Sequence, residues 1–85
     1  MIAQVPQLSG LQRDVLKLYR DCLRMIRAKP PESQARFRGY LRGEFEKHRH
    51  LARVRDAATI EYLLRKGRRR LEMYRSPNIT DIHKL

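Results

Sequence analysis

Cysteine and tryptophan are scarce in this sequence of 85 residues, which contains one cysteine, Cys22, and no tryptophan. A single thiol cannot form an intramolecular disulfide, and it cannot complete the four-thiolate set that usually holds an iron–sulfur cluster. No run of 18 apolar residues occurs, so we expect no membrane-spanning helix. The tryptophan or phenylalanine insertion pattern of an interfacial helix is missing too, which argues against attachment to a membrane surface.

Sequence patterns that indicate chemistry are also lacking. No nucleophile stands in a recognisable motif, no glycine-rich loop follows a strand, and the acidic residues are scattered, so we expect no enzyme activity and no catalytic residue. Of the three histidines, His48, His50 and His83, the first two would lie on different faces of a helix. We therefore predict no metal site and no cofactor of the protein's own.

Positive charge dominates what is present, because 20 Lys and Arg residues against 9 Asp and Glu give a formal net charge of +11. Such a charge indicates an anionic partner, which could be nucleic acid, a membrane surface or an acidic protein. A chain this short buries only about 60% of its unfolded surface, so a bound partner is an expected source of stability. The N-terminus lacks the layout of a secretory signal, and its basic, acid-poor first thirty residues suit mitochondrial import.

Apolar spacing and chain breakers predict one all-α domain over residues 9–75, an antiparallel three-helix bundle with up-down-up topology. The predicted segments are a flexible lead, three helices and a C-terminal tail: residues 1–8, 10–28, 33–49, 57–75 and 76–85. Pro30 and Pro31 should end the first helix, and Asp56 offers an N-cap for the third. The tail has too little apolar content to fold alone.

The first predicted helix carries two adjoining apolar stripes. One stripe consists of Leu11, Val15, Leu18, Cys22 and Met25. The second consists of Leu16, Tyr19, Leu23 and Ile26. Because two stripes can contact two other helices at once, we expect this helix at the centre of the bundle.

Four residues of the other two helices carry specific expectations. Glu44 projects onto the inward face of the second helix, where an unpaired carboxylate would be costly, so we expect an arginine partner or a solvated edge. Gly39 and Gly43 lie together on its outer face, and each costs about 1 kcal/mol relative to alanine. Gly67 falls in the middle of the apolar stripe of the third helix, where its missing side chain allows a close helix contact or leaves room for a buried ligand.

The densest charge lies in the third predicted helix, in the run Arg65-Lys66-Gly67-Arg68-Arg69-Arg70. Pairs four positions apart, such as Glu72 with Arg68, would neutralise only part of it. A run of this kind is often just a solvated helix face. Tyr62 and Met73 project outward beside it, however, and this combination favours a contact surface. The predicted surface consists of Tyr62, Arg65, Lys66, Arg68, Arg69 and Arg70.

Leucine, tyrosine and arginine follow one another at positions 18–20, inside the segment Gly10-Leu11-Gln12-Arg13-Asp14-Val15-Leu16-Lys17-Leu18-Tyr19-Arg20-Asp21. Two further segments are Arg42-Gly43-Glu44-Phe45 and Ile60-Glu61-Tyr62-Leu63-Leu64-Arg65-Lys66-Gly67-Arg68-Arg69. Together the three segments resemble the LYR-motif family of mitochondrial proteins. The last one most resembles the members that assist the assembly of succinate dehydrogenase, and the resemblance covers roughly residues 10–75.

The resemblance implies a LYR-type bundle that works as an adaptor in the mitochondrial matrix. It implies that Leu18, Tyr19 and Arg20 recruit partners, and that the arginine-rich segment binds the iron–sulfur subunit of succinate dehydrogenase during cluster insertion and maturation. These members are also linked to the co-chaperone that delivers iron–sulfur clusters. Many family members bind mitochondrial acyl carrier protein, whose acyl-4′-phosphopantetheine chain enters the bundle. The expected lining of that channel is Tyr19, Phe45, Leu64 and Gly67.

Two other interpretations stay open. The chain could be an adaptor or accessory subunit of another respiratory or iron–sulfur assembly complex that is bound to acyl carrier protein. A helical nucleic-acid-binding domain would also have a basic face, since neutralising phosphates needs little more. Against nucleic acid, the arginines of the third helix share their surface with acids, and no helix-turn-helix spacing stands out. We therefore expect protein partners.

Overall fold

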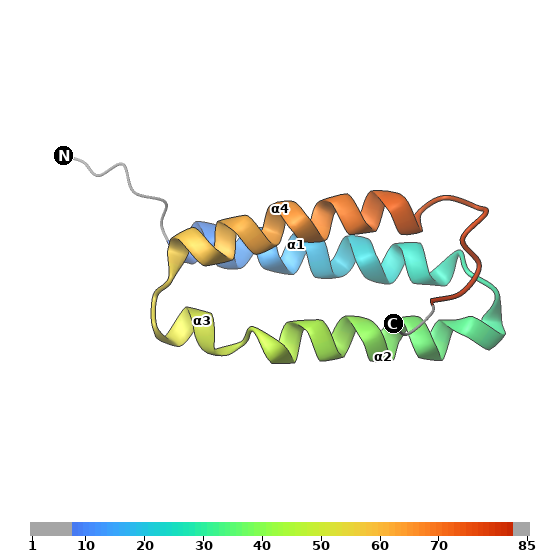
Figure 1. Cartoon of the computed structure of the whole chain (residues 1–85), viewed down its shortest axis with the longest axis horizontal. Helices are drawn as coiled ribbons and strands as arrows, with labels where there is room; N and C mark the ends of the chain where they lie inside the picture. The colour runs from blue at the N-terminus through green and yellow to red at the C-terminus, as the bar shows by residue number, and fades with distance from the viewer. Residues whose placement is uncertain (1–7, 83–85) are drawn as a thin grey trace.

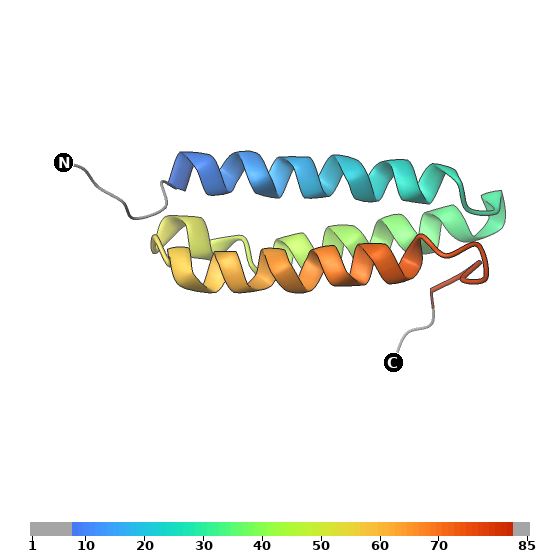
Figure 2. The same ribbon diagram turned by 90° about the horizontal axis from the view of Figure 1, so that it is seen from above.

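The computed structural model describes residues 8–82, apart from the side chains of residues 8, 9 and 52. Its helices in this range are α1 (Leu8–Arg27), α2 (Pro31–Lys47), α3 (His50–Arg53) and α4 (Ala57–Tyr74). The three long helices run up, down and up beside one another, and α1 contacts both α2 and α4 (Figure 1 and Figure 2). Residues 8–82 contain no strand, so the predicted all-α three-helix bundle is confirmed. No helix among them is long and apolar enough to cross a membrane.

The helix ends follow from local chemistry, with shifts of one or two residues from the prediction. Pro30 is extended (φ −56°, ψ 141°) and separates α1 from α2, while Pro31 occupies the first position of α2, where proline is well tolerated. α2 ends at Lys47, and the short helix α3, which the sequence does not predict, then packs against α4. The predicted cap of α4 is confirmed, because the carboxylate of Asp56 accepts a hydrogen bond from the backbone N–H of Thr59 at 3.1 Å.

The core lies where α1 faces the other long helices, as its two apolar stripes predict. The buried core cluster consists of Leu18, Met25, Ile26, Phe37, Leu41, Leu71 and Ile82. The expectation for Leu16 is wrong, because its side chain is 53% exposed. Tyr19 and Leu23 of the same stripe pack against the core, whereas Leu16 lies at the outer margin of that stripe.

The expected positions of the glycines and of Glu44 are confirmed. A Cβ atom at Gly67 would lie 2.8 Å from Cδ2 of Leu18, so α1 and α4 make a close contact there. Gly39 and Gly43 face open space on the outer side of α2, with nothing within 4 Å of an added Cβ. Of the two expectations for Glu44, the arginine partner is found: Arg70 lies 3.5 Å away across the bundle, and Lys47 of the same helix lies 3.0 Å away.

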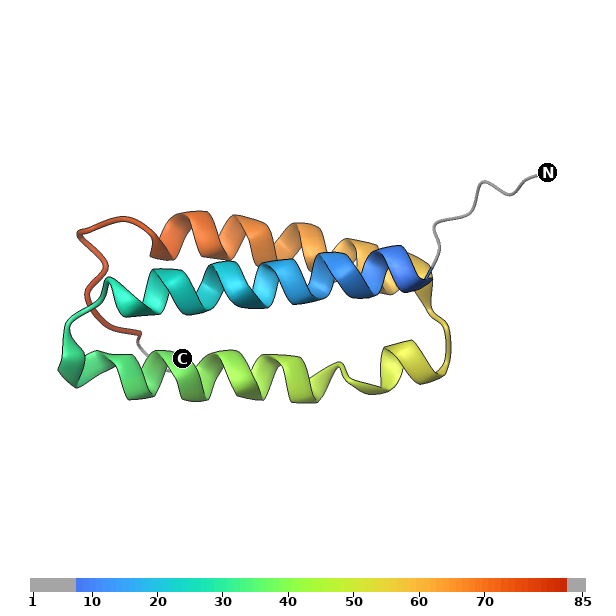
Figure 3. The same cartoon turned by 180° about the vertical axis from the view of Figure 1, so that it is seen from behind.

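The residues after α4 turn back across the end of the bundle and lie beside the first turns of α2 (Figure 1 and Figure 3). We call residues 76–82 the C-terminal strap. Ile82 is buried in the core cluster, and Ile79 packs against it. The tail predicted over residues 76–85 is therefore part of the packed domain as far as residue 82, while residues 83–85, with His83, and residues 1–7 of the predicted lead lie outside the described range.

Candidate functional site

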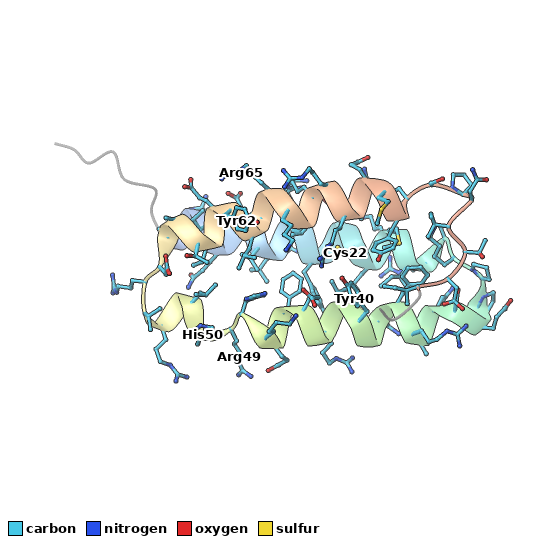
Figure 4. All side chains as sticks on the ribbon, viewed as in Figure 1. Cys22, Tyr40, Arg49, His50, Tyr62 and Arg65 are labelled. Atoms are coloured by element: carbon cyan, nitrogen blue, oxygen red, sulfur yellow. The ribbon has the colours of Figure 1, made fainter. Side chains whose placement is uncertain are left out.

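The outer side of α4 presents cations beside two exposed apolar side chains. Arg65 and Arg69 are exposed, Lys66 is half-buried, and Tyr62 and Met73 are 51% and 52% exposed. In Figure 4, Tyr62 and Arg65 lie on α4, with Arg65 turned away from α2. Within residues 10–82, no carboxylate lies at ion-pair distance from the three cations, since the ion pairs of this region involve other arginines. We call these five residues the basic face.

Arg68 lies apart from the basic face, because its guanidinium points towards α1. It lies 3.7 Å from the carboxylate of Asp21, which is only 7% exposed and also contacts Lys17 at 3.3 Å and Arg24 at 3.1 Å. Burial alone would raise the pKa of Asp21, but the hydrogen bond from Lys17 and the charges of all three cations lower the pKa below its ordinary value of 3.8. Arg68 therefore joins α4 to α1.

The prediction that Arg68 pairs with Glu72 is wrong. Glu72 lies 2.6 Å from Arg75, one turn further along the chain. Arg68 contacts Asp21 instead, because a carboxylate that α1 and α4 jointly bury has fewer water molecules to compete for it. Spacing along one helix does not reveal a partner on another helix.

Arg70 also lies outside the basic face, and its side chain extends from α4 to α2. Its guanidinium donates a hydrogen bond to the Tyr40 hydroxyl at 2.7 Å and lies 3.5 Å from Glu44. Tyr40 rises from α2 towards α4 in Figure 4. Burial raises the pKa of Tyr40 above its ordinary value, so the phenol stays neutral and accepts this hydrogen bond. The predicted surface thus divides into an outward group and two arginines that hold helices together.

The tripeptide at positions 18–20 points in three directions. Leu18 is buried against Gly67, and Tyr19 is half-buried with its ring edge-to-face on Phe45 of α2, at 5.1 Å between centroids. Arg20 is exposed and has no ion pair within residues 10–82. Two of the three residues therefore build the bundle, and Arg20 is the one that is fully available to a partner.

A large apolar groove of about 1,110 Å³ runs between α1, α2 and α4. Of the four residues predicted to line a channel, Phe45, Leu64 and Gly67 line this groove. Tyr19 does not line it but supports Phe45 from the α1 side. The volume lies slightly above the usual range for a small-molecule site, and the lining is mostly apolar, as a hydrocarbon ligand requires.

Cys22 lines the same groove, and in Figure 4 it lies between the helices. Burial, together with the nearby charge of Asp21, raises the pKa of its thiol from 9.0 to about 11. The thiol is therefore protonated at neutral pH. A protonated thiol is a poor nucleophile and a poor metal ligand.

Alkylation should test this environment. In the folded protein, the rate of Cys22 alkylation by iodoacetamide is expected to keep rising until about pH 11, because only the thiolate reacts. In denaturant the alkylation rate should level off near pH 9.0, which is the ordinary pKa of the thiol. A plateau near pH 9 in the folded protein, with helicity intact by circular dichroism, would contradict the assigned burial.

Metal-binding side chains do not gather in the described part of the chain, where no group of three or more His, Cys, Asp or Glu residues could hold an ion. His48 is half-buried at the groove, whereas His50 is exposed in α3. Figure 4 shows His50 and Arg49 at the break between α2 and α3. What the described residues bring together is an exposed basic face and an apolar groove.

Comparison with known proteins places the chain in a family. Residues 13–73 match the family Complex 1 protein (LYR family), and the chain belongs to it. The chain is similar to succinate dehydrogenase assembly factor 1, mitochondrial, of Saccharomyces cerevisiae, with 46% identity over 77 residues that cover 91% of this chain and 96% of the relative. The Schizosaccharomyces pombe protein of that name is 42% identical over 76 residues, covering 89% and 95%. The Bos taurus protein is 50% identical over 72 residues, which cover 85% of this chain and 56% of that protein. No solved structure matches the chain significantly.

Proposed function

We propose that this protein is a non-catalytic assembly factor for succinate dehydrogenase in the mitochondrial matrix. One observation carries the proposal: a basic face that has no acidic partner within residues 10–82 lies on a chain that aligns, over almost its whole length, with relatives named as succinate dehydrogenase assembly factor 1. A charged surface that is not neutralised from within is free to dock on an acidic partner, because no internal ion pair must break first.

The client is the iron–sulfur subunit of succinate dehydrogenase, bound through the basic face. Arg65 and Arg69 lie four residues apart and are both exposed, so each guanidinium group can donate two hydrogen bonds to one carboxylate. The exposed side chains of Tyr62 and Met73 add an apolar contact area between the charges. The bundle thereby covers the immature subunit, shields its clusters from oxidants, and departs when the flavoprotein subunit binds.

The acyl-4′-phosphopantetheine chain of mitochondrial acyl carrier protein fills the groove. Each methylene that moves from water into the groove contributes about 0.8 kcal/mol, which is a substantial gain for a domain of this size. Arg20 and the other exposed cations of α1 suit an acidic carrier protein, which they would steer and orient. The same α1 surface is the proposed contact for the iron–sulfur co-chaperone.

Affinity capture with the tagged full-length chain tests the function. From a mitochondrial matrix extract we expect enrichment of the iron–sulfur subunit of succinate dehydrogenase and of acyl carrier protein, identified by mass spectrometry. Recovery of subunits from a different respiratory complex, without the iron–sulfur subunit, would overturn the proposal in favour of an adaptor for that complex. Capture that nuclease treatment abolishes would indicate a nucleic-acid-binding domain instead.

A further inference from the structure

The two ends of α2 are held in different ways. At the N-terminal end, the C-terminal strap lies against the residues that begin the helix. Lys29, only 7% exposed, donates hydrogen bonds from Nζ to the carbonyl oxygens of Ser76, at 3.1 Å, and Ile79. Its ammonium group also lies 5.8 Å from the centre of the Phe37 ring. Moving the strap away would break both hydrogen bonds and expose the apolar side chains of Ile79 and Ile82 to water, so this contact resists opening.

Two further strap contacts hold the first turns of α2 itself. The Ser33 hydroxyl, which is fully buried, donates to the carbonyl oxygen of Thr80 at 2.7 Å. Arg36 donates from Nε to the Asp81 carboxylate at 3.0 Å. With Ile82 in the core cluster, these contacts clamp the N-terminal half of α2 by polar and apolar interactions together.

In the C-terminal half of α2, Leu41 belongs to the core cluster and Phe45 packs against it, but few polar and ring contacts reach α4 across the groove. Arg70 bridges from α4 to the Tyr40 hydroxyl and to Glu44, and Tyr74 of α4 contacts the Tyr40 ring at 6.3 Å between centroids. Within residues 10–82, no hydrogen bond, ion pair or ring contact joins α2 to α4 beyond Glu44. Phe45, the next residue, faces Tyr19 of α1 instead.

The backbone of α2 is weakened on the same side. Gly39 and Gly43 lie in its middle and C-terminal parts, and each costs about 1 kcal/mol in helix stability relative to alanine. The helix ends at Lys47, and the turn at His48 and Arg49 separates it from α3, which packs against α4. This turn can act as a joint, so that the C-terminal half of α2 moves while α3 stays in place.

We propose that α2 is a hinged wall of the central groove, with the C-terminal strap as its fixed end and Arg70 as the clip that holds its C-terminal half closed. When Arg70 loses its contacts with Tyr40 and Glu44, α2 and α4 can separate along the edge of the groove that these contacts bridge. Arg70 is thus a positioning residue for the groove. The ligand that opening admits is the acyl chain, and in this respect the inference rests on the proposed function.

Hydrogen exchange of the free, full-length protein tests the hinge. Arg70→Met removes the clip but keeps an apolar side chain, so amides of residues 41–47 should exchange about tenfold faster while those of residues 34–38 keep their protection. Arg69→Met, on the exposed face of the same helix, is the matched control and should change neither segment. Equal acceleration along all of α2, or none, in Arg70→Met would overturn the hinge.

The fixed end has its own test. Asp81→Asn should accelerate hydrogen exchange in residues 34–38. Swapping the two charges, in the double variant Arg36→Glu with Asp81→Arg, should restore protection. If Asp81→Asn leaves these amides protected, the strap is not the fixed end. The same follows if the double variant does not regain their protection although circular dichroism shows full helicity. Both tests are made without any partner, so their failure is independent of the client and of the carrier protein.

Binding of the fluorescent fatty acid cis-parinaric acid tests the hinge motion and the identity of the ligand separately. Arg70→Met should raise its association rate in stopped-flow fluorescence by about the same tenfold factor as the exchange of residues 41–47. An unchanged association rate with faster exchange would overturn the role of Arg70 as a clip for ligand access. If neither protein binds the fatty acid while the exchange pattern holds, the acyl ligand in the proposed function is wrong and the hinge stands.

Discussion

Replacing Arg65 and Arg69 together by glutamate is expected to lower the affinity for the iron–sulfur subunit of succinate dehydrogenase at least about a hundredfold, because like charges brought together across an interface cost several kcal/mol. The bundle should stay folded, since neither arginine has an ion-pair partner within residues 10–82. Arg68 must stay in this experiment, because a glutamate there would face the buried carboxylate of Asp21 and disturb the contact between α1 and α4.

The matched control reverses two arginines elsewhere on the molecule. Arg38 and Arg42 are exposed on α2, have the same four-residue spacing, and have no ion pair among the described residues. Arg38→Glu with Arg42→Glu therefore changes the net charge equally without touching the basic face. Quantitative capture should be lost in the first double variant and retained in the second. Equal losses in both would mean that total charge, rather than the basic face, attracts the client.

Leucine at Gly67 is expected to destabilise the protein by about 2 kcal/mol, because a side chain there would overpack the contact with Leu18 and push α1 and α4 apart. Leucine at Gly43 should do the opposite and stabilise by roughly 0.5–1 kcal/mol, since it faces open space and leucine is a good helix former. Chemical unfolding followed by circular dichroism measures both. The two substitutions are identical, so a gain in stability at position 67 would show that the close helix contact is absent.

The sequence predicts the three long helices and their central contact because these depend on local patterns. The two stripes of α1, the Asp56 cap and the place of Gly67 in an apolar stripe are each contained in one helix, and the structure agrees with them. Leu16 is the exception, because the extent of a buried face depends on how far the neighbouring helix reaches.

The strap and the directions of the arginines could not be predicted, because they depend on contacts between distant segments. Residues 76–82 have no apolar period, and Lys29, Ser33 and Arg36, which hold them, are about 45 to 50 positions away in the chain. Likewise, Arg68 and Arg70 belong to the same basic run as Arg65, and only the packing of α4 decides which of them turn inward. The run therefore predicts a docking surface but not its members.

Titration of the purified iron–sulfur subunit of succinate dehydrogenase with the full-length chain, at increasing salt concentration, tests the central claim most directly. If the basic face captures the client, Kd should rise steeply with salt, because screening weakens attraction between exposed charges. The Arg65→Glu, Arg69→Glu protein should bind weakly at every salt concentration. Tight binding that neither salt nor this double reversal changes would contradict the account.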